Sequence, residues 1–239
     1  MTRLMPRYPV PPVPELARAG GSTVEEMANW WLVYYDSEPV PWNYLCGTKI
    51  VRKSYSGLHN LRLLLAGCET EKIDQGRRSN AEVVTLAAPR AFGRQMQVFD
   101  LPRRQFPFGR DIRSGYRIPF FFVESGVVKL YHLQPRKGAS VTRDQMGMIA
   151  TIYKRFILNQ EFYGQKSDVE IVDLAVDPGT KERVVNSYSL GELELWSEER
   201  LQDRLTMVAE SLDRVWNSGL IKVRDRRGRR PDPDMPLFD

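Results

Sequence analysis

The sequence predicts an α+β fold, with a mixed or antiparallel sheet and flanking helices, in a chain of 239 residues. Two observations lead to this prediction. Segments that read as strands gather in the second half of the chain, and segments with apolar residues at helical spacing flank them. Hydrophobic residues make up 42% of the chain and charged residues 27%, which is ordinary for a globular protein and sufficient for a core.

We expect three parts: a proline-rich arm (1–21), a single α+β domain (22–220) and a basic, flexible tail (221–239). Prolines in the arm disfavour both a helix and a regular strand, and they favour an extended polyproline geometry. Apolar residues alternate with these prolines, so the arm is expected to pack along the body. The prolines are Pro6, Pro9, Pro11, Pro12 and Pro14.

The first helix of the domain is predicted to begin at Ser22 or Thr23, because each of them can form a capping box with a following glutamate. Trp30, Trp31 and Tyr34 then recur at helical spacing. This spacing is typical of a core-facing stripe, although stacking on nucleobases is a second interpretation. A short helix is expected within 56–67.

The least regular stretch is 68–113. Asn80 is interpreted as the cap of a short apolar segment, and residues 95–101 alternate like a strand. Arginines interleave with phenylalanines here, a pattern typical of nucleic-acid surfaces and also of loops over a core. These arginines are Arg94, Arg103, Arg104, Arg110 and Arg113, among Phe99, Phe106 and Phe108.

The second half has the clearest pattern. Strands are predicted at 118–124 and 127–135 around a Ser125-Gly126 turn, and again at 168–176 and 182–190. Thr142 and Ser197 are predicted to open two helices, the second of which ends at Asn217-Ser218-Gly219. The resulting order is strand, strand, helix, strand, strand, helix.

The hairpin and helix within about 116–160 resemble the core of PDDEXK, or restriction-endonuclease-like, nucleases, including the endonuclease subunit of Tn7-type transposons. Those enzymes carry an acid in one strand after a "PD"-like step and Glu/Gln-x-Lys in the next, which together hold Mg²⁺ beside the scissile phosphate. Here Phe120 follows Pro119 at the acid position. His132 and Gln134 stand at the acid and lysine positions of the second strand, or Gln134-Pro135-Arg136 forms the triplet in a shifted frame. The resemblance implies a nuclease-like scaffold whose catalytic positions are lost.

Three functions therefore stay open. The leading one is a non-catalytic, DNA-associated accessory or assembly protein without a cofactor. The second is an active Mg²⁺-dependent nuclease, and the third is a protein-interaction module with no nucleic-acid role. If the chain is a nuclease, the expected ligands are Glu124, Gln134, Asp168 and Glu170.

The charge distribution makes DNA or another polyanion the expected partner. The net charge is +5, and six basic residues accompany a single acid, Asp225, between Lys222 and Arg230. A solvated tail that keeps the protein soluble is the alternative. The residues expected to bind nucleic acid are Arg103, Arg104, Arg136, Lys137, Arg226, Arg227, Arg229 and Arg230.

The last residues suggest a protein partner as well. Asp234-Met235-Pro236-Leu237-Phe238 resembles the peptide, approximately Gln-Leu-x-Leu-Phe, by which bacterial polymerases and repair proteins dock into the sliding clamp. The resemblance implies that Met235, Leu237 and Phe238 are apolar anchors, with Asp234 in place of the expected glutamine.

The remaining motifs restrict the chemistry and the location. Two histidines and no Cys-x-x-Cys supply no zinc cluster, and no phosphate-binding glycine loop occurs. Cys46 and Cys68 do not define a disulfide framework. No apolar run reaches the length of a membrane span and no secretory signal is visible, so we expect a cytoplasmic protein with no membrane contact.

Overall fold

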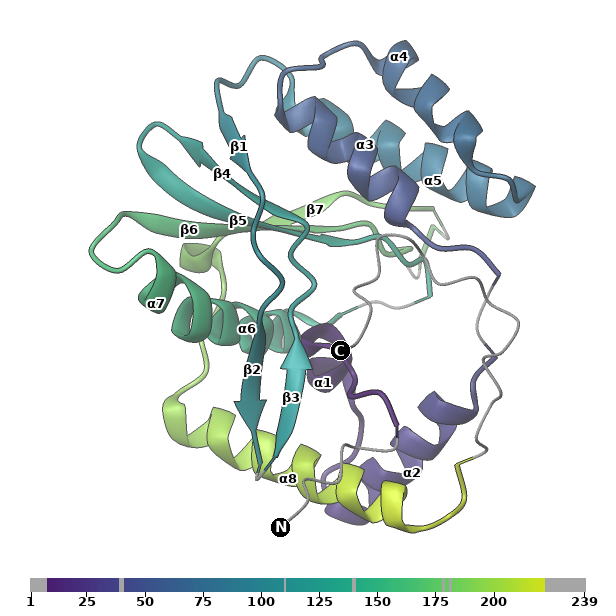
Figure 1. Cartoon of the computed structure of the whole chain (residues 1–239), viewed down its shortest axis with the longest axis vertical. Coiled ribbons are helices and arrows are strands. Elements are labelled where there is room, and N and C mark those ends of the chain that lie inside the picture. Colours follow the sequence, from purple (N-terminus) through teal and green to yellow (C-terminus); the bar gives the residue numbers. More distant parts are fainter. Residues whose placement is uncertain are drawn as a thin grey trace.

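A mixed five-stranded sheet lies at the centre of the fold (Figure 1). The computed structural model describes residues 8–38, 41–109, 111–138, 141–177, 179–180 and 182–221. Strands β5 and β6 are parallel, and the other neighbours are antiparallel. The predicted α+β class and mixed sheet are confirmed. In spatial order the strands are β1 (Gln97–Phe99), β4 (Phe120–Glu124), β5 (Val127–Gln134), β6 (Ser167–Asp173) and β7 (Asn186–Tyr188).

Helices cover both faces of this sheet (Figure 1). Side chains alternate along each strand, so Tyr131 of β5 joins one buried cluster and Leu130 joins the other. One layer consists of α3 (Leu45–Tyr55), α4 (Leu61–Ala66), η1 (Gly67–Thr70), α5 (Asp74–Ala87) and η2 (Ala88–Ala91). The opposite layer begins with α6 (Arg143–Tyr153), the π-helical turn η3 (Lys154–Leu158) and α7 (Asn159–Glu161).

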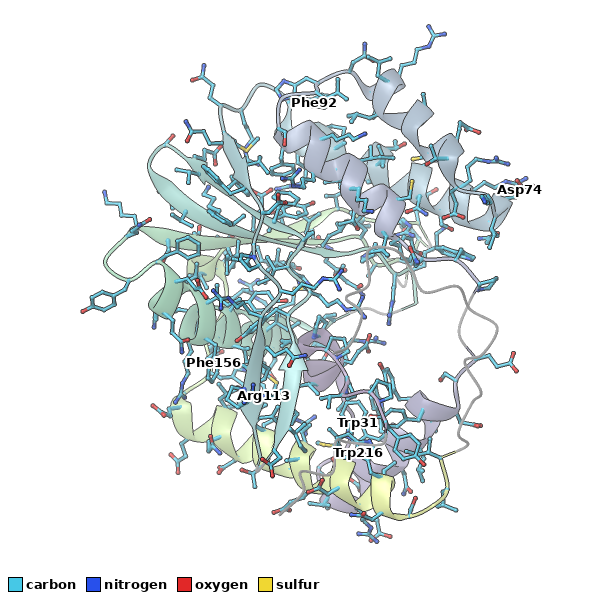
Figure 2. All side chains as sticks on the ribbon, in the orientation of Figure 1. Trp31, Asp74, Phe92, Arg113, Phe156 and Trp216 are labelled. Atoms are coloured by element: carbon cyan, nitrogen blue, oxygen red, sulfur yellow. The ribbon has the colours of Figure 1, made fainter. Side chains whose placement is uncertain are left out.

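A two-stranded ribbon, β2 (Gln105–Phe108) and β3 (Ile112–Gly115), crosses this second layer and reaches α8 (Glu198–Asn217). Phe106 and Phe108 of β2 turn their side chains inward and are buried, so these aromatic residues belong to the core. The short turn η4 (Leu190–Glu192) precedes α8, which packs along α2 (Val24–Asp36). Figure 2 shows Trp31 and Trp216 at this end of the molecule, far from Phe92 and Asp74. The core interpretation of Trp31 is confirmed, since its side chain is fully buried.

The predicted helix starts are confirmed where a capping residue is present. Thr142 and Gln145 form both hydrogen bonds of a capping box before α6. Thr23 accepts from the Glu26 backbone before α2, and Ser197 caps α8 in the same way. The helix expected within 56–67 begins later, at Leu61, because the side chain of Asn60 caps it.

Prolines do not prevent a helix in the arm, and that expectation was wrong. Helix α1 (Val13–Arg18) contains Pro14 in its first turn, where no intrahelical N–H bond is needed. Tyr8, Val13 and Leu16 are buried in the main core. The described part of the arm is thus packed against the body, as its apolar residues suggested. The predicted tail from residue 222 onward lies outside the described residues.

Asn80 is not a helix cap, which corrects the sequence interpretation. It lies in the middle of α5 and is fully buried. Its Oδ1 accepts from the Gly47 backbone N–H at 2.7 Å, and its Nδ2 donates to the carbonyls of Asn43 and Gly76 at 2.9 and 2.8 Å. This one amide therefore fastens α5 to the start of α3, a helix that the sequence pattern did not reveal.

We expect Asn80→Leu to lower the free energy of unfolding by about 2 kcal/mol, because it leaves the Gly47 N–H buried without a partner. Urea unfolding followed by circular dichroism measures the change. Arg78→Leu, an exposed position on the same helix, is the matched control and should shift stability by less than about 0.5 kcal/mol. Equal stability of the two variants would contradict the bracing role of Asn80.

Candidate functional site

A carboxylate–arginine cluster lies on the sheet face that packs against α3 and α5. It comprises Tyr55, Arg90, Arg94, Glu124, Lys129 and Glu170. Glu124 ends β4 and Glu170 lies in β6, on the two sides of β5. The register sets Glu124 opposite Val127 and Tyr131 beside Glu170, so both glutamates project from the same face.

Arg94 binds both glutamates at once. Its Nε and Nη2 donate to Glu124 Oε1 and Oε2 at 2.7 and 2.8 Å, and its Nη1 and Nη2 donate to Glu170 Oε1 and Oε2 at 3.2 and 2.9 Å. The side chains of Arg94 and Glu170 are only 22% and 9% exposed. This fork geometry makes strong, charge-assisted pairs that hold β4 and β6 to the segment after η2.

The surrounding side chains complete the cluster. Lys129 Nζ lies 2.9 Å from Glu124 Oε2. Arg90 donates to Ser187 Oγ of β7 at 2.7 Å, and the hydroxyl of Tyr55 donates to Glu170 Oε1. The rings of Tyr55 and Phe122 lie 5.5 and 5.3 Å from the Arg94 Cζ, where their faces attract the cation.

The electrostatics of the cluster favour a paired rather than a metal-bound state. Hydrogen bonds from Arg94, supported by Lys129, lower the pKa of Glu124 to about 2. The same hydrogen bonds raise the pKa of Arg94. Arg90, Arg94 and Lys129 bring three positive charges to two carboxylates, so an added divalent cation would meet net repulsion.

Two of the four expected metal ligands come together and two do not. Glu124 and Glu170 share Arg94, whereas the Oδ1 of Asp168 accepts from the Val169 and Leu190 backbone N–H groups, both at 2.8 Å. Strand alternation turns Gln134 to the opposite sheet face, on the side of Leu130. Within the described ranges, no group of three or more His, Cys, Asp or Glu residues is placed to hold a metal ion.

The positions that correspond to metal ligands in the nuclease resemblance hold residues that make other contacts in this structure. Phe120 is fully buried and stacks on Tyr131 with ring centroids 4.5 Å apart. His132 lies on the other face, where its Nδ1 is 2.9 Å from the Tyr153 hydroxyl. Burial lowers the pKa of His132 to about 4, so its ring is neutral at neutral pH.

The predicted nucleic-acid residues lie in separate places. Arg136 and Lys137 follow β5 and pair with Glu15 of α1 at 2.6 Å and Glu82 of α5 at 2.9 Å. Arg104 begins the approach to β2 and pairs with Glu161 at 3.0 Å, next to Arg103. The other predicted contacts lie outside the described residues: Arg226, Arg227, Arg229, Arg230, Met235, Leu237 and Phe238.

Sequence reasoning missed the role of Arg94. It grouped this arginine with the residues of a nucleic-acid surface, because its neighbours along the chain are basic and aromatic. Its true partners are 30 and 76 residues away, and no local pattern indicates them.

Comparison with known proteins yields no relative. No family model matches the chain, no curated protein matches it, and no solved structure matches it. Among the described residues, no helix combines the length and apolarity that a bilayer crossing requires.

Proposed function

We propose that this protein is a non-catalytic, DNA-associated accessory or assembly protein built on a nuclease-like sheet. The observation that carries the proposal is the position of Arg94, whose guanidinium bridges Glu124 and Glu170. In a metal-dependent nuclease, carboxylates on neighbouring strands hold a divalent cation that orients and activates water. Here a guanidinium binds both carboxylates, and it cannot act as a base at neutral pH.

The residues at the other positions of the nuclease resemblance support the same conclusion. Phe120, at the position where the resemblance requires an acid, is an inward-facing aromatic residue. The antiparallel hairpin β4–β5 followed by α6 retains the order that the resemblance implies. The combination supports a scaffold that keeps its shape and uses its former metal-binding face for internal ion pairing.

The basic character of the chain supports association with DNA. A net charge of +5 favours binding to a polyanion, since each phosphate that a lysine or arginine neutralises releases counterions.

An active nuclease is the second candidate, and one specific observation favours it. Glu124, Lys129 and Glu170 lie on three neighbouring strands and project from one face. Those residue types match a metal site with an accompanying lysine. Catalysis would require Arg94 to leave both glutamates so that a cation could enter.

Incubation with supercoiled plasmid in Mg²⁺ or Mn²⁺ tests the proposal. We expect no nicking above buffer, together with retention on immobilised DNA that weakens as salt rises. Nicking that disappears in Glu124→Ala but persists in Glu199→Ala, an exposed control on α8, would establish the nuclease instead. If immobilised DNA does not retain the protein even at low salt, the protein-interaction module becomes the favoured function.

A further inference from the structure

The two cysteines of the chain lie on packed elements, the first turn of α3 and the short helix η1. Both are free thiols. The Sγ of Cys46 lies 3.7 Å from the carbonyl oxygen of Gly67 and 3.7 Å from the hydroxyl oxygen of Thr70. Cys68 stands between these two residues in η1. We propose that Cys46 and Cys68 form a reversible oxidation site, in which a hydroperoxide converts the two thiols to one disulfide bond.

A glycine lets η1 and α3 approach closely at this point. A Cβ atom at Gly67 would lie only 3.1 Å from the Cδ1 of Ile50, which is one turn along α3 from Cys46. Cys68 is fully buried in the same hydrophobic cluster as Ile50, and Cys46 packs against that cluster. A disulfide requires Cα atoms no more than about 7 Å apart, and so a close approach of this kind.

Hydrogen bonds hold both cysteines in place before any oxidation. The backbone N–H groups of Leu45 and Gly47, on either side of Cys46, donate to asparagine side chains at 2.9 and 2.7 Å. In η1, the hydroxyl of Thr70 donates at 2.9 Å to the first carbonyl of the turn, which encloses the second cysteine. Thiols that the fold already holds side by side react with little further loss of entropy.

The two thiols have different roles in the reaction. Cys46 is half-buried and accessible to a small oxidant, whereas Cys68 is fully buried. Burial, with smaller effects from the neighbouring Cys46 and Glu69, raises the pKa of Cys68 to about 11. Because a thiolate is the nucleophile that attacks a peroxide, the protonated Cys68 is not the first residue to react. Cys46 is therefore the residue that the peroxide oxidises.

The reaction has two steps. The Cys46 sulfur attacks the terminal peroxide oxygen, the O–O bond breaks, and the other oxygen leaves with the thiol proton, as water or an alcohol, so that Cys46 becomes a sulfenic acid. The Cys68 sulfur then attacks the Cys46 sulfur, the S–O bond breaks, and the departing oxygen takes the Cys68 proton and leaves as water. The thiols lose two electrons and two protons in total, and the peroxide gains them.

Treatment of the full chain with hydrogen peroxide, followed by mass spectrometry, tests the proposal. After the remaining thiols are blocked, trypsin cuts at Lys49 and Arg62, so the cysteines fall in separate peptides that only a disulfide joins. We expect the joined peptides at about 2 Da below the summed mass of the reduced pair, and their separation by dithiothreitol. Peptide masses also distinguish this product from oxidised methionine.

Two variants separate the two steps. Cys68→Ala removes the second step, so we expect peroxide to leave Cys46 as a sulfenic acid, a gain of about 16 Da that dimedone traps. Cys46→Ser is the matched variant, and its buried Cys68 should stay reduced. Oxidised wild type should unfold at least about 5 °C above the reduced protein, because the bond closes residues 46–68 into a loop in the unfolded chain. Cys46→Ser should show no such rise.

Four results would overturn the proposal, and all of them can be observed in the wild type. They are a sulfenic acid at Cys46 that persists while Cys68 stays free, a disulfide that joins two copies of the chain, joined peptides that form only after denaturation, and an oxidised protein that unfolds below the reduced one. Each would show that the fold does not hold the two thiols in place for this bond.

Discussion

Replacing Arg94 with methionine is expected to lower the free energy of unfolding by about 3–5 kcal/mol at pH 7. The substitution keeps the apolar stem that packs near Tyr55 and Phe122, but it leaves Glu124 and Glu170 without the cation that they share. Lys129 and Arg90 stay beside the two carboxylates, but the largely buried Glu170 loses both hydrogen bonds from Arg94, which costs more than the loss of an exposed ion pair. Urea unfolding measures the effect.

The difference in the free energy of unfolding between the wild type and Arg94→Met should also depend on pH, which gives an independent check on the role of Arg94. The pKa of Glu124 is lowered from an ordinary value of 4.5 to about 2 in the folded protein. The pair therefore stabilises the wild type fully above about pH 4.5, and that stability is lost as the pH falls toward 2. Arg94→Met has no such stability to lose, so the gap between the two proteins should narrow in acid.

Two further variants distinguish the bridge from general packing. Lys129→Met removes a cation from Glu124 alone and should cost about 1 kcal/mol. Glu124→Gln and Glu170→Gln, added to Arg94→Met, should recover part of the loss because no unpaired charge remains. The bridging role would be contradicted if Arg94→Met lowered the free energy of unfolding by less than about 1 kcal/mol and this difference did not change with pH.

Lowering the pH from about 6.5 to 4 is expected to reduce the free energy of unfolding by up to about 3 kcal/mol through His132 alone. Burial lowers the pKa of this histidine from 6.5 to about 4 in the folded state. Over that interval the unfolded chain binds a proton that the folded chain excludes, so acid favours unfolding. Unfolding curves in urea between pH 7 and pH 4 measure the slope.

The second histidine of the chain provides the control. His132→Gln should flatten the profile above about pH 4.5, where Glu124 has not yet begun to titrate. His59→Gln, at an exposed position, should retain the wild-type slope. If the free energy of unfolding of wild type and of His132→Gln changed with pH in the same way, the pH dependence would not arise from His132.

Local signals in the sequence account for most of the elements that were predicted. The hairpin around Ser125 and Gly126 has both residues in positive-φ conformations, as a tight turn between apolar strands requires. Thr142 and Ser197 open their helices through side-chain bonds within three residues. Such features depend on neighbours along the chain, and the sequence therefore reports them directly.

Elements defined by distant contacts were missed or misplaced. Helix α5 contains Gly76, Ser79 and Asn80, residue types that disfavour a helix interior, and the Gly47 backbone N–H of the distant α3 supplies the partner of the Asn80 side chain. At the start of helix α3 the N-cap residue, Tyr44, makes no side-chain cap, and the Leu45 N–H is bound instead by the side chain of Asn43. Glu124 was a proposed metal ligand on sequence grounds, but Arg94, which decides its chemistry, reaches it only through the folded sheet.

The hydroxyl of Tyr8 lies 3.4 Å from the carbonyl oxygen of Ile221, so positions 8 and 221 lie next to each other in the fold. A segment whose two boundary positions are this close can be joined by a short linker or inserted into an accepting loop of another protein with little strain at either junction. The Ser125-Gly126 turn, which is exposed, then offers a place for new termini in a circular permutant.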